Sequence, residues 1–306
     1  RGSPDRASSG RCRCCRRQCP EWPKEEPAID LIDTHQHLIL RRSLGYAWAD
    51  AIPALAGRDF DRADYAALVA GHGVSATIFM ETGVDDADYR AEARLVAAMV
   101  GQGGMLGQIA SCRPEEDAGL DAWLEECRGL HVVGFRRITH VLPDAVSQAA
   151  IFRRNIARIG AAGWPVDLCF LARQHGLCEA LVLACPDVRF VLDHCGTPDI
   201  AGGDFAVWRA GMARLADLPN LWVKLSGITA YAAPGAGIDA VRPYAEEVLR
   251  LFGPRRMVWG GDWPVVNLGA GLPGWIAMTR SLLAGLSQDE RALVGHRNAR
   301  ALYLGE

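Results

Sequence analysis

Two histidines separated by one residue form the first pattern in the sequence that could carry out chemistry. His35 and His37 follow a short apolar run and lie in the stretch DTHQH, residues 33–37. Because alternate side chains of a strand lie on the same face, both imidazoles can point into one site. Neutral imidazoles bind divalent metal ions and can also polarise a carbonyl group. The spacing therefore predicts either a metal site or a cluster of neutral histidines.

Two further polar residues follow other apolar runs. His194 comes directly after residues 188–193, and Asp262 comes after residues 257–259 and a pair of glycines that let the backbone pass closely. A charged or polar side chain in such a position lies too close to the core to be only a solvated surface group. We therefore interpret His194 and Asp262 as catalytic candidates, together with the two histidines of the first run.

Residues at the ends of other apolar runs could contact a substrate or a metal ion. Arg136 and Arg137 are consecutive, so only one of them can face the site. We favour Arg136, whose guanidinium offers a fork for a carboxylate or a developing oxyanion. Glu81 could be a metal ligand or could orient the histidines. Lys224 could contact the substrate or pair with a carboxylate in the interior.

The apolar runs themselves predict the scaffold. Short runs occur at residues 29–33, 75–80, 105–110, 132–136, 165–170, 188–193, 221–225 and 257–259. Amphipathic helical stretches separate them at 61–70, 89–100, 117–128, 149–162, 173–184, 204–216 and 239–252, and a last helix runs from Ser287 to about Tyr303. Eight such strand–helix units predict a parallel sheet that closes into a (β/α)₈ TIM barrel, in which the chemistry lies at the carboxyl ends of the strands. The rival is a doubly wound sheet, but the glycine-rich turn typical of that fold does not follow the first run.

Composition limits the class of protein. Half of the 306 residues are hydrophobic and the formal net charge is −3, which is typical of a globular protein and argues against nucleic acid as the main partner. No apolar run approaches the roughly 20 residues needed to cross a bilayer. The expectation is a cytoplasmic protein with no membrane partner.

The N-terminal segment has a composition of its own. Residues 1–27 are rich in arginine and contain four of the ten cysteines, in the string CRCCRRQC. A metal or redox knot is conceivable there, but the string lacks the paired spacing of a zinc site. We expect residues 1–27 to be a disordered extension and residues 28–306 to form a single barrel domain. The other six cysteines are scattered singly, as small core residues are.

The motifs around the candidate residues resemble those of the amidohydrolase superfamily, and within it the lactonase branch. The resemblance rests on residues 33–37, 190–199, 223–227 and 260–264, which occur in the order of the family's motifs and extend it over about residues 29 to 303. The branch includes L-fuconolactonase, L-rhamnonolactonase and 2-pyrone-4,6-dicarboxylate lactonase. The resemblance implies a distorted TIM barrel that hydrolyses the ester of a cyclic lactone, with the four catalytic candidates in its site.

The resemblance also bears on a cofactor. A single divalent metal ion, with zinc favoured, could be held by His35, His37 and Asp262, and Glu81 is a further candidate ligand. Many metal-dependent members have a histidine on the fifth strand and a carboxylated lysine on the fourth. This sequence has neither, so a binuclear centre is not expected. Because some lactonases of the branch work without metal, a metal-independent mechanism stays open.

The expected reaction is water attack on the carbonyl of a small lactone or related carboxylic ester. Asp262 would act first as general base and then as general acid, while Arg136 orients the substrate. Trp48, Trp263 and Tyr231 could stack on a sugar face, which favours an aldonolactone, whereas arginines near the mouth could favour an acidic substrate. The protein could form a homo-oligomer.

Three other functions remain open from the sequence. One is a different amidohydrolase-type hydrolase, and another is a decarboxylase of the superfamily, which would ordinarily need the fifth-strand histidine that is missing here. The third is a non-catalytic barrel used for binding.

Overall fold

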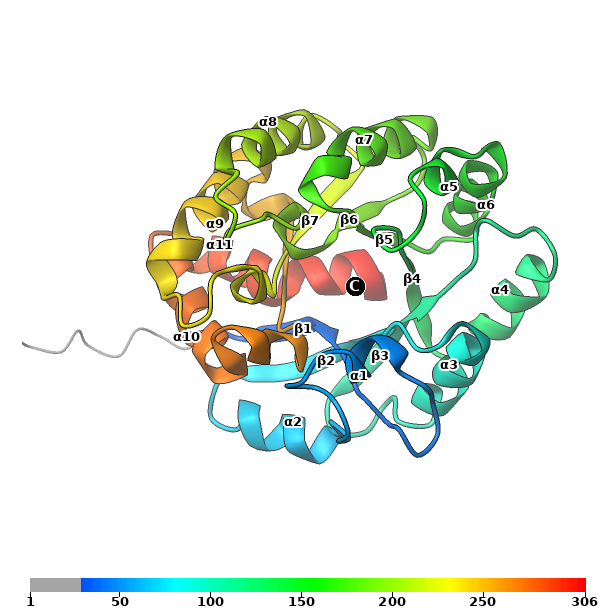
Figure 1. Ribbon diagram of the computed structural model, residues 1–306, viewed down its shortest axis with the longest axis horizontal. Coiled ribbons are helices and arrows are strands. Elements are labelled where there is room, and N and C mark those ends of the chain that lie inside the picture. The colour runs from blue at the N-terminus through cyan, green and yellow to red at the C-terminus, as the bar shows by residue number, and fades with distance from the viewer. Residues whose placement is uncertain (1–28) are drawn as a thin grey trace, which may run out of the picture.

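The fold is a parallel barrel with helices around it (Figure 1). The computed structural model describes residues 29–306, and the predicted extension 1–27, with its cysteine cluster, lies outside the described residues. Eight strands pair in parallel in chain order. They are β1 Leu31–Gln36, β2 Val74–Met80, β3 Met105–Ser111, β4 Val132–Ile138, β5 Val166–Cys169, β6 Phe190–Leu192, β7 Leu221–Ser226 and β8 Met257–Gly260. The predicted TIM barrel is confirmed, and each strand lies within three residues of its predicted bounds.

Helices alternate with the strands and cover the outside of the barrel. They are α1 Ala47–Asp50, α2 Arg62–Val69, α3 Tyr89–Ala97, α4 Leu120–Arg128, α5 Ala145–Gln148, α6 Ala150–Ala161, α7 His175–Ala184, α8 Phe205–Ala216, α9 Ile238–Phe252, α10 Gly271–Leu283 and α11 Gln288–Ala292. Helices α1, α5 and α10 were not predicted from the sequence. Two of these are single turns, and α10 contains two glycines and a proline that obscure its apolar pattern.

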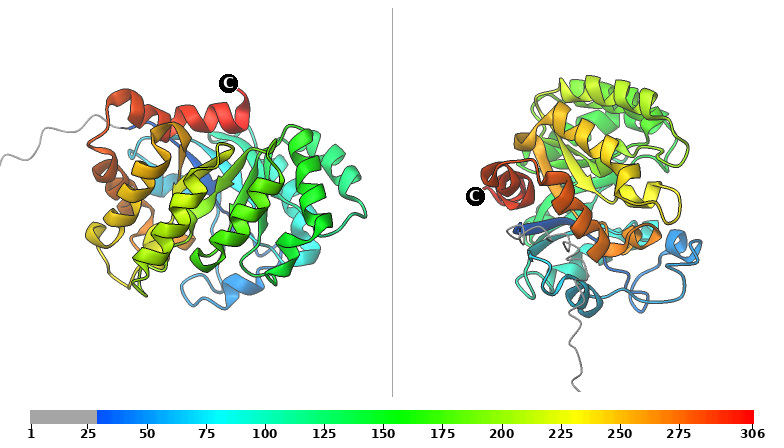
Figure 2. Two further views of the ribbon diagram at one scale, coloured as in Figure 1. Left: turned by 90° about the horizontal axis from the view of Figure 1, so that it is seen from above. Right: turned by 90° about the vertical axis from the view of Figure 1, so that its left-hand side faces the viewer.

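The C-terminal segment closes one end of the barrel. The predicted cap is confirmed, because Ser287 and Glu290 hydrogen-bond each other's backbone amides at the start of α11. The segment then continues as two π-helical turns, η7 Leu293–Arg297 and η8 Arg300–Leu304, where one continuous α-helix was expected. Figure 2 shows this segment (red) across one end of the molecule and the segment after β1 (blue) at the opposite end.

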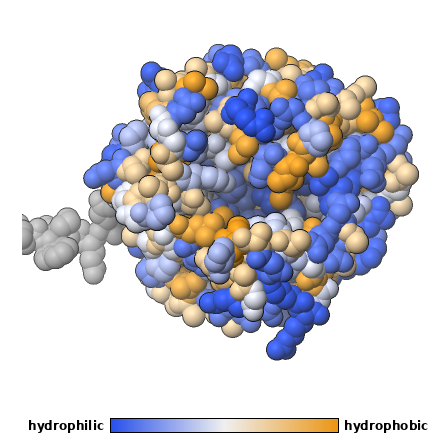
Figure 3. All heavy atoms as spheres, viewed as in Figure 1, coloured by the Kyte–Doolittle hydropathy of each residue, from blue (hydrophilic) through white to orange (hydrophobic). Residues whose placement is uncertain are grey.

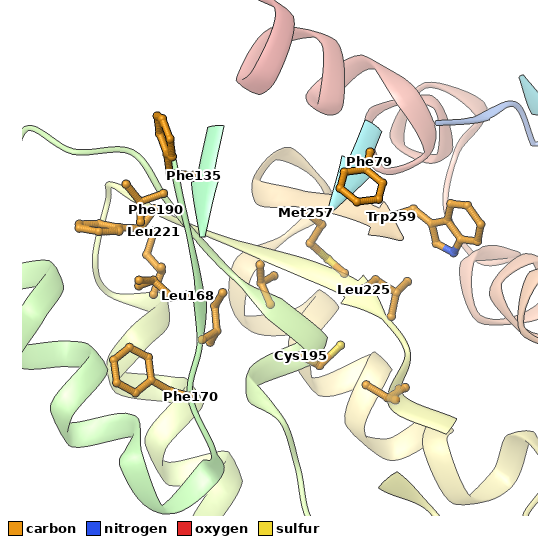
Figure 4. Packing of buried hydrophobic residues seen from close by; sticks show 14 of the residues in the cluster. Phe79, Phe135, Leu168, Phe170, Phe190, Cys195, Leu221, Leu225, Met257 and Trp259 are labelled. Atoms are coloured by element: carbon orange, nitrogen blue, oxygen red, sulfur yellow. The ribbon is translucent and has the colours of Figure 1, made fainter. Parts of the chain in front are cut away.

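The core has two parts. The larger lies between the sheet and the surrounding helices, and Figure 4 shows Phe190, Leu221 and Met257 on its strand side. The smaller lies inside the barrel, where Ile32 and Ile78 meet Tyr303 of the C-terminal segment. The six cysteines of the described residues are all buried and form no disulfide with one another. Among the described residues no helix is long and apolar enough to span a membrane.

Residues just after β8 complete the closure of the barrel. The backbone N–H of Asp262 donates to the carbonyl oxygen of His35 at 2.8 Å, and the N–H of His37 donates to that of Trp263 at 2.9 Å. A parallel bridge joins Gln36 to Trp263. The closure of the barrel therefore places Asp262 directly beside His35 of β1 and His37, which follows that strand.

Candidate active site

Asp262 lies between His35 and His37 at the carboxyl end of the barrel. Its Oδ1 is 3.4 Å from His37 Nε2 and 3.8 Å from His35 Nε2. The Asp262 backbone is left-handed, with φ of +56°, which turns the carboxylate away from the ordinary strand direction. Gly227 lies against this carboxylate, since a Cβ at that position would be 2.1 Å from Asp262 Oδ2. The absence of a side chain at Gly227 leaves the space that the carboxylate fills.

His194 reaches the same place from β6. The chain turns sharply after that strand, and His194 has a φ of +52°. Its ring centroid is 4.5 Å from that of His35, and its Nδ1 is 3.9 Å from Asp262 Oδ2. Ser226, at the end of β7, accepts from the His194 backbone N–H at 3.3 Å and lies 3.0 Å from its Nδ1. The Ser226 hydroxyl can donate to Nδ1, and when it does so the single proton of the neutral His194 ring is on Nε2.

His35 and His194 are uncharged near neutral pH. Burial lowers the pKa of His35 well below its usual range, and the nearby charge of Asp193 only partly opposes this effect. Burial likewise lowers the pKa of His194, against the attraction of Asp262 and Asp193. Both rings can therefore act as neutral hydrogen-bonding groups or as metal ligands.

Arg136 faces the site, whereas its neighbour Arg137 lies toward the rim. Arg136 Nε donates to Glu81 Oε1 at 2.6 Å, and its Nη1 is 3.1 Å from His35 Nε2. Arg136 is only 3% exposed. Arg137 pairs with Glu115. The guanidinium of Arg136 and the carboxylate of Glu81 thus neutralise each other beside the histidines.

Lys224 lies deeper, inside the barrel, and is fully buried. Its ammonium donates to Asp167 Oδ2 and is 3.3 Å from Asp193 Oδ1. Burial disfavours the charge of Asp193, but Lys224, His35 and Arg136 outweigh it and hold the pKa of Asp193 well below its usual range. Burial raises the pKa of Asp167 to about 7, despite Lys224.

This interior ion pair supports the site from below. Asp193 Oδ1 is 3.4 Å from His35 Nδ1, on the side of the ring opposite Arg136. A carboxylate at Nδ1 favours the proton there and leaves the Nε2 lone pair to accept either from Arg136 or, in its place, to bind a metal ion. Asp193 was not predicted to have a role, although its place directly before His194 at a strand end was an available signal.

A cavity of about 500 Å³ opens above the cluster. Figure 3 shows it as a hollow near the middle of the face, with hydrophilic residues inside and hydrophobic patches at its rim. His37, Glu81, Arg136, His194 and Asp262 line it. So do residues that sequence analysis did not assign to the site, namely Ser111, Arg113, His140 and Cys169.

The aromatic candidates separate into two groups. Trp48 and Tyr231 line the cavity, and Trp48 Nε1 donates to the carbonyl oxygen of Thr82 at 2.9 Å. Trp263 does not line it. Its ring is 1% exposed and packs edge-on against Phe60 and Tyr65 on the outer side of the strand. The left-handed turn before Trp263 sends its side chain out of the barrel.

The donor set fits a divalent metal ion. His37 Nδ1 is 3.0 Å from the carbonyl oxygen of Met80, which can only accept, so Nδ1 carries the proton and the Nε2 lone pair faces Asp262. Asp262 Oδ2 is buried and has no hydrogen-bond partner among the described residues. One ligand atom from each of His35, His37 and Asp262 lies within 4.8 Å of the others. Two acceptors facing each other in a buried site are stabilised by a cation between them.

Glu81 is not part of this set, because its carboxylate pairs with Arg136 and accepts from the backbone N–H of Gly83 at 2.9 Å. A second group of three potential ligands, His35, Asp193 and His194, shares only His35 with the first.

Comparison with known proteins defines the class. A parallel barrel with histidines and an aspartate at its carboxyl end is the architecture of TIM-barrel hydrolases, and the amidohydrolase family model matches residues 32–304. The chain belongs to the amidohydrolase family.

Two curated relatives and one solved structure are similar over most of their lengths. L-fucono-1,5-lactonase of Burkholderia ambifaria is 30% identical over 283 residues, covering 89% of this chain and 94% of that protein. L-fucono-1,5-lactonase of Burkholderia multivorans is 29% identical over 298 residues, covering 90% and 96%. The crystal structure of an amidohydrolase from Burkholderia multivorans with bound zinc has a TM-score of 0.82 and 26% identity, covering 90% of this chain and 99% of that chain.

Proposed function

We propose that the protein hydrolyses a cyclic sugar lactone to the corresponding hydroxy acid. The observation that carries this proposal is the Asp262 carboxylate, which is held beside His35 and His37, lines the cavity and has one oxygen without a hydrogen-bond partner among the described residues. Such an oxygen can take a proton from a water molecule in the cavity. The similarity to L-fucono-1,5-lactonases supports a lactone as the substrate.

Asp262 moves the proton in both halves of the reaction. The water oxygen bonds to the lactone carbonyl carbon while Asp262 takes one of its protons. The bond from the carbonyl carbon to the ring oxygen then breaks, and Asp262 returns the proton to that oxygen. The product is an open-chain hydroxy acid, and Asp262 is again a carboxylate.

Two neighbouring groups act on the lactone in this proposal. When Ser226 donates to Nδ1, neutral His194 has its proton on Nε2 and can donate a hydrogen bond to the carbonyl oxygen as charge develops on it. Arg136, whose charge is balanced by Glu81, orients the substrate. A zinc ion held by His35, His37 and Asp262 would act as a Lewis acid that polarises the same carbonyl.

The charge balance of the cavity supports a neutral substrate. Its three arginines each pair with a carboxylate, in the pairs Arg113–Asp86, Arg136–Glu81 and Arg137–Glu115. A dicarboxylate would have to compete with these protein carboxylates for the guanidinium groups. Trp48 and Tyr231 offer aromatic surface on which a sugar ring can pack. We therefore favour a polyhydroxylated aldonolactone over an acidic lactone.

Lys224 and Trp263, both predicted as substrate contacts, take positioning roles in this proposal. Lys224 holds Asp193, which orients His35. Trp263 anchors the turn that carries Asp262, through its contacts with Phe60 and Tyr65.

A panel of lactones tests the proposal. Each lactone opened releases a proton, so a pH indicator records the rate for aldonolactones and for 2-pyrone-4,6-dicarboxylate. We expect aldonolactones to open far faster than they do without enzyme, and the dicarboxylate to open more slowly. A flat response across the panel would contradict the proposed function, and release of CO₂ from an aromatic acid would indicate a decarboxylase instead.

A further inference from the structure

His140 and Cys169 form a pair in the cavity wall that the reaction above does not use. Cys169 is the last residue of β5, and His140 follows β4. Cys169 Sγ is 3.2 Å from His140 Nδ1, and the His140 backbone N–H donates to the Cys169 carbonyl oxygen at 3.2 Å. The hydroxyl of Thr139 donates to the same carbonyl at 2.6 Å. Backbone and side chain of His140 are therefore both held by Cys169.

The chemistry of the pair determines where its protons lie. Burial and the nearby charge of Asp193 raise the pKa of the Cys169 thiol far above its usual range, so the sulfur keeps its proton. Because a thiol is a weak acceptor and an imidazole nitrogen a good one, the S–H group donates to Nδ1. Burial, together with the charge of Arg136, lowers the pKa of His140, so the ring is neutral and its single proton is on Nε2.

Nε2 is the part of the ring that is available to a ligand. His140 lines the cavity together with His194 and Asp262, and among the described residues its Nε2 has no hydrogen-bond partner. A neutral N–H group fixed in a largely buried wall is suited to an uncharged oxygen, such as a hydroxyl of a sugar lactone.

We propose that His140 donates a hydrogen bond from Nε2 to an oxygen of the bound lactone and helps to set substrate specificity, while the Cys169 thiol is a positioning group that fixes the tautomer of His140. The substrate contact rests on the proposed function, whereas the role of Cys169 does not. The two parts can therefore be tested separately.

Nitrogen-15 NMR of the histidine rings tests the positioning role without any substrate. In the wild-type protein we expect the proton of His140 on Nε2 and none on Nδ1. Cys169→Ala should turn this single tautomer into a mixture. Cys178→Ala, which removes an equally buried thiol from α7, should leave it unchanged. A proton on Nδ1 in the wild-type protein, or the same tautomer in Cys169→Ala, would overturn the role of Cys169.

Kinetics test the substrate contact. His140→Phe should raise KM for the best aldonolactone about 10-fold or more, the effect of losing one hydrogen bond, while kcat stays within about 3-fold. His140→Gln, whose amide can still donate, should recover most of the loss. A KM in His140→Phe equal to that of the wild type, or one that His140→Gln does not restore, would overturn the contact.

Lactones that lack one hydroxyl identify the group that His140 binds. For one member of the series, the wild-type protein should have a higher KM than it has for the complete lactone. For that same member, His140→Phe should have a KM no higher than it has for the complete lactone. Equal losses in both proteins for every member would contradict a specific contact. If the wild-type protein opens no lactone, the proposed function and the contact both fail, and the NMR result still decides the role of Cys169.

Discussion

Replacement of Gly227 by alanine should damage catalysis through the position of Asp262. The added Cβ would lie 2.1 Å from Asp262 Oδ2, whereas ordinary contact begins at 3.4 Å, so the carboxylate must move by about 1.3 Å. A displacement of about 1 Å at a reacting group can reduce the rate about 100-fold. Gly227 also has a φ of +60°, which costs a non-glycine residue about 1–2 kcal/mol in folding free energy.

Gly235 provides a matched control. Its φ is +77°, but a Cβ there would meet nothing within 4 Å. Gly235→Ala should therefore lose about the same 1–2 kcal/mol of stability and keep its activity. Urea unfolding gives the stability of both variants, and initial rates of lactone opening are compared where both are fully folded. If folded Gly227→Ala opened the lactone as fast as Gly235→Ala, the reasoning about Asp262 would be refuted.

Two further predictions concern metal binding and pH. After treatment with a chelator and reloading with zinc, the protein should hold about one zinc ion per chain by elemental analysis. His37→Ala should not take up that ion, whereas His131→Ala, a control at an exposed residue, should. Equal zinc in both variants would exclude the predicted ligand set. Burial also lowers the pKa of His175, whose Nδ1 has no hydrogen-bond partner among the described residues. The unfolded chain therefore binds a proton below about pH 6.5 that the folded protein resists, and stability should decrease between pH 7 and pH 5, by at most about 2 kcal/mol at pH 5 for this histidine. Urea unfolding at several pH values measures the decrease, which should be smaller in His175→Gln; an identical slope in the variant would show that His175 does not contribute.

The fold was predictable because each strand carries its own local signal. Strands buried on both faces read as continuous apolar runs, and their number and spacing indicate a closed barrel. Helix α10 was missed because Pro273 and two glycines interrupt its pattern, although tertiary packing stabilises it. The π-helical turns after α11 leave no signal in an apolar periodicity.

The sequence predicts which residues lie together in the site wherever these residues follow regular parallel strands. His35, His37, His194 and Asp262 do lie together, because parallel strands deliver their carboxyl ends to one place. The position of Trp263 could not be inferred from alternation, since the left-handed turn at Asp262 reverses the side of the sheet on which it lies.

Side-chain contacts across the barrel could also not be predicted from the sequence. Lys224 and Asp167 are 57 residues apart, and only the closed sheet shows that they form an ion pair. The pairing of His140 with Cys169 likewise depends on the register of β4 and β5, in which Ile138 is opposite Cys169. These contacts decide which strand-end residues reach the cavity and which support them.

The most direct test of the central claim compares the wild-type protein with Asp262→Asn on L-fucono-1,5-lactone. The initial rate of proton release, corrected for spontaneous opening, should be reduced about 100- to 10,000-fold in the variant, which is the usual contribution of a general base. Its unfolding midpoint in urea should stay close to that of the wild type. A folded Asp262→Asn protein that opens the lactone at the wild-type rate would contradict the account.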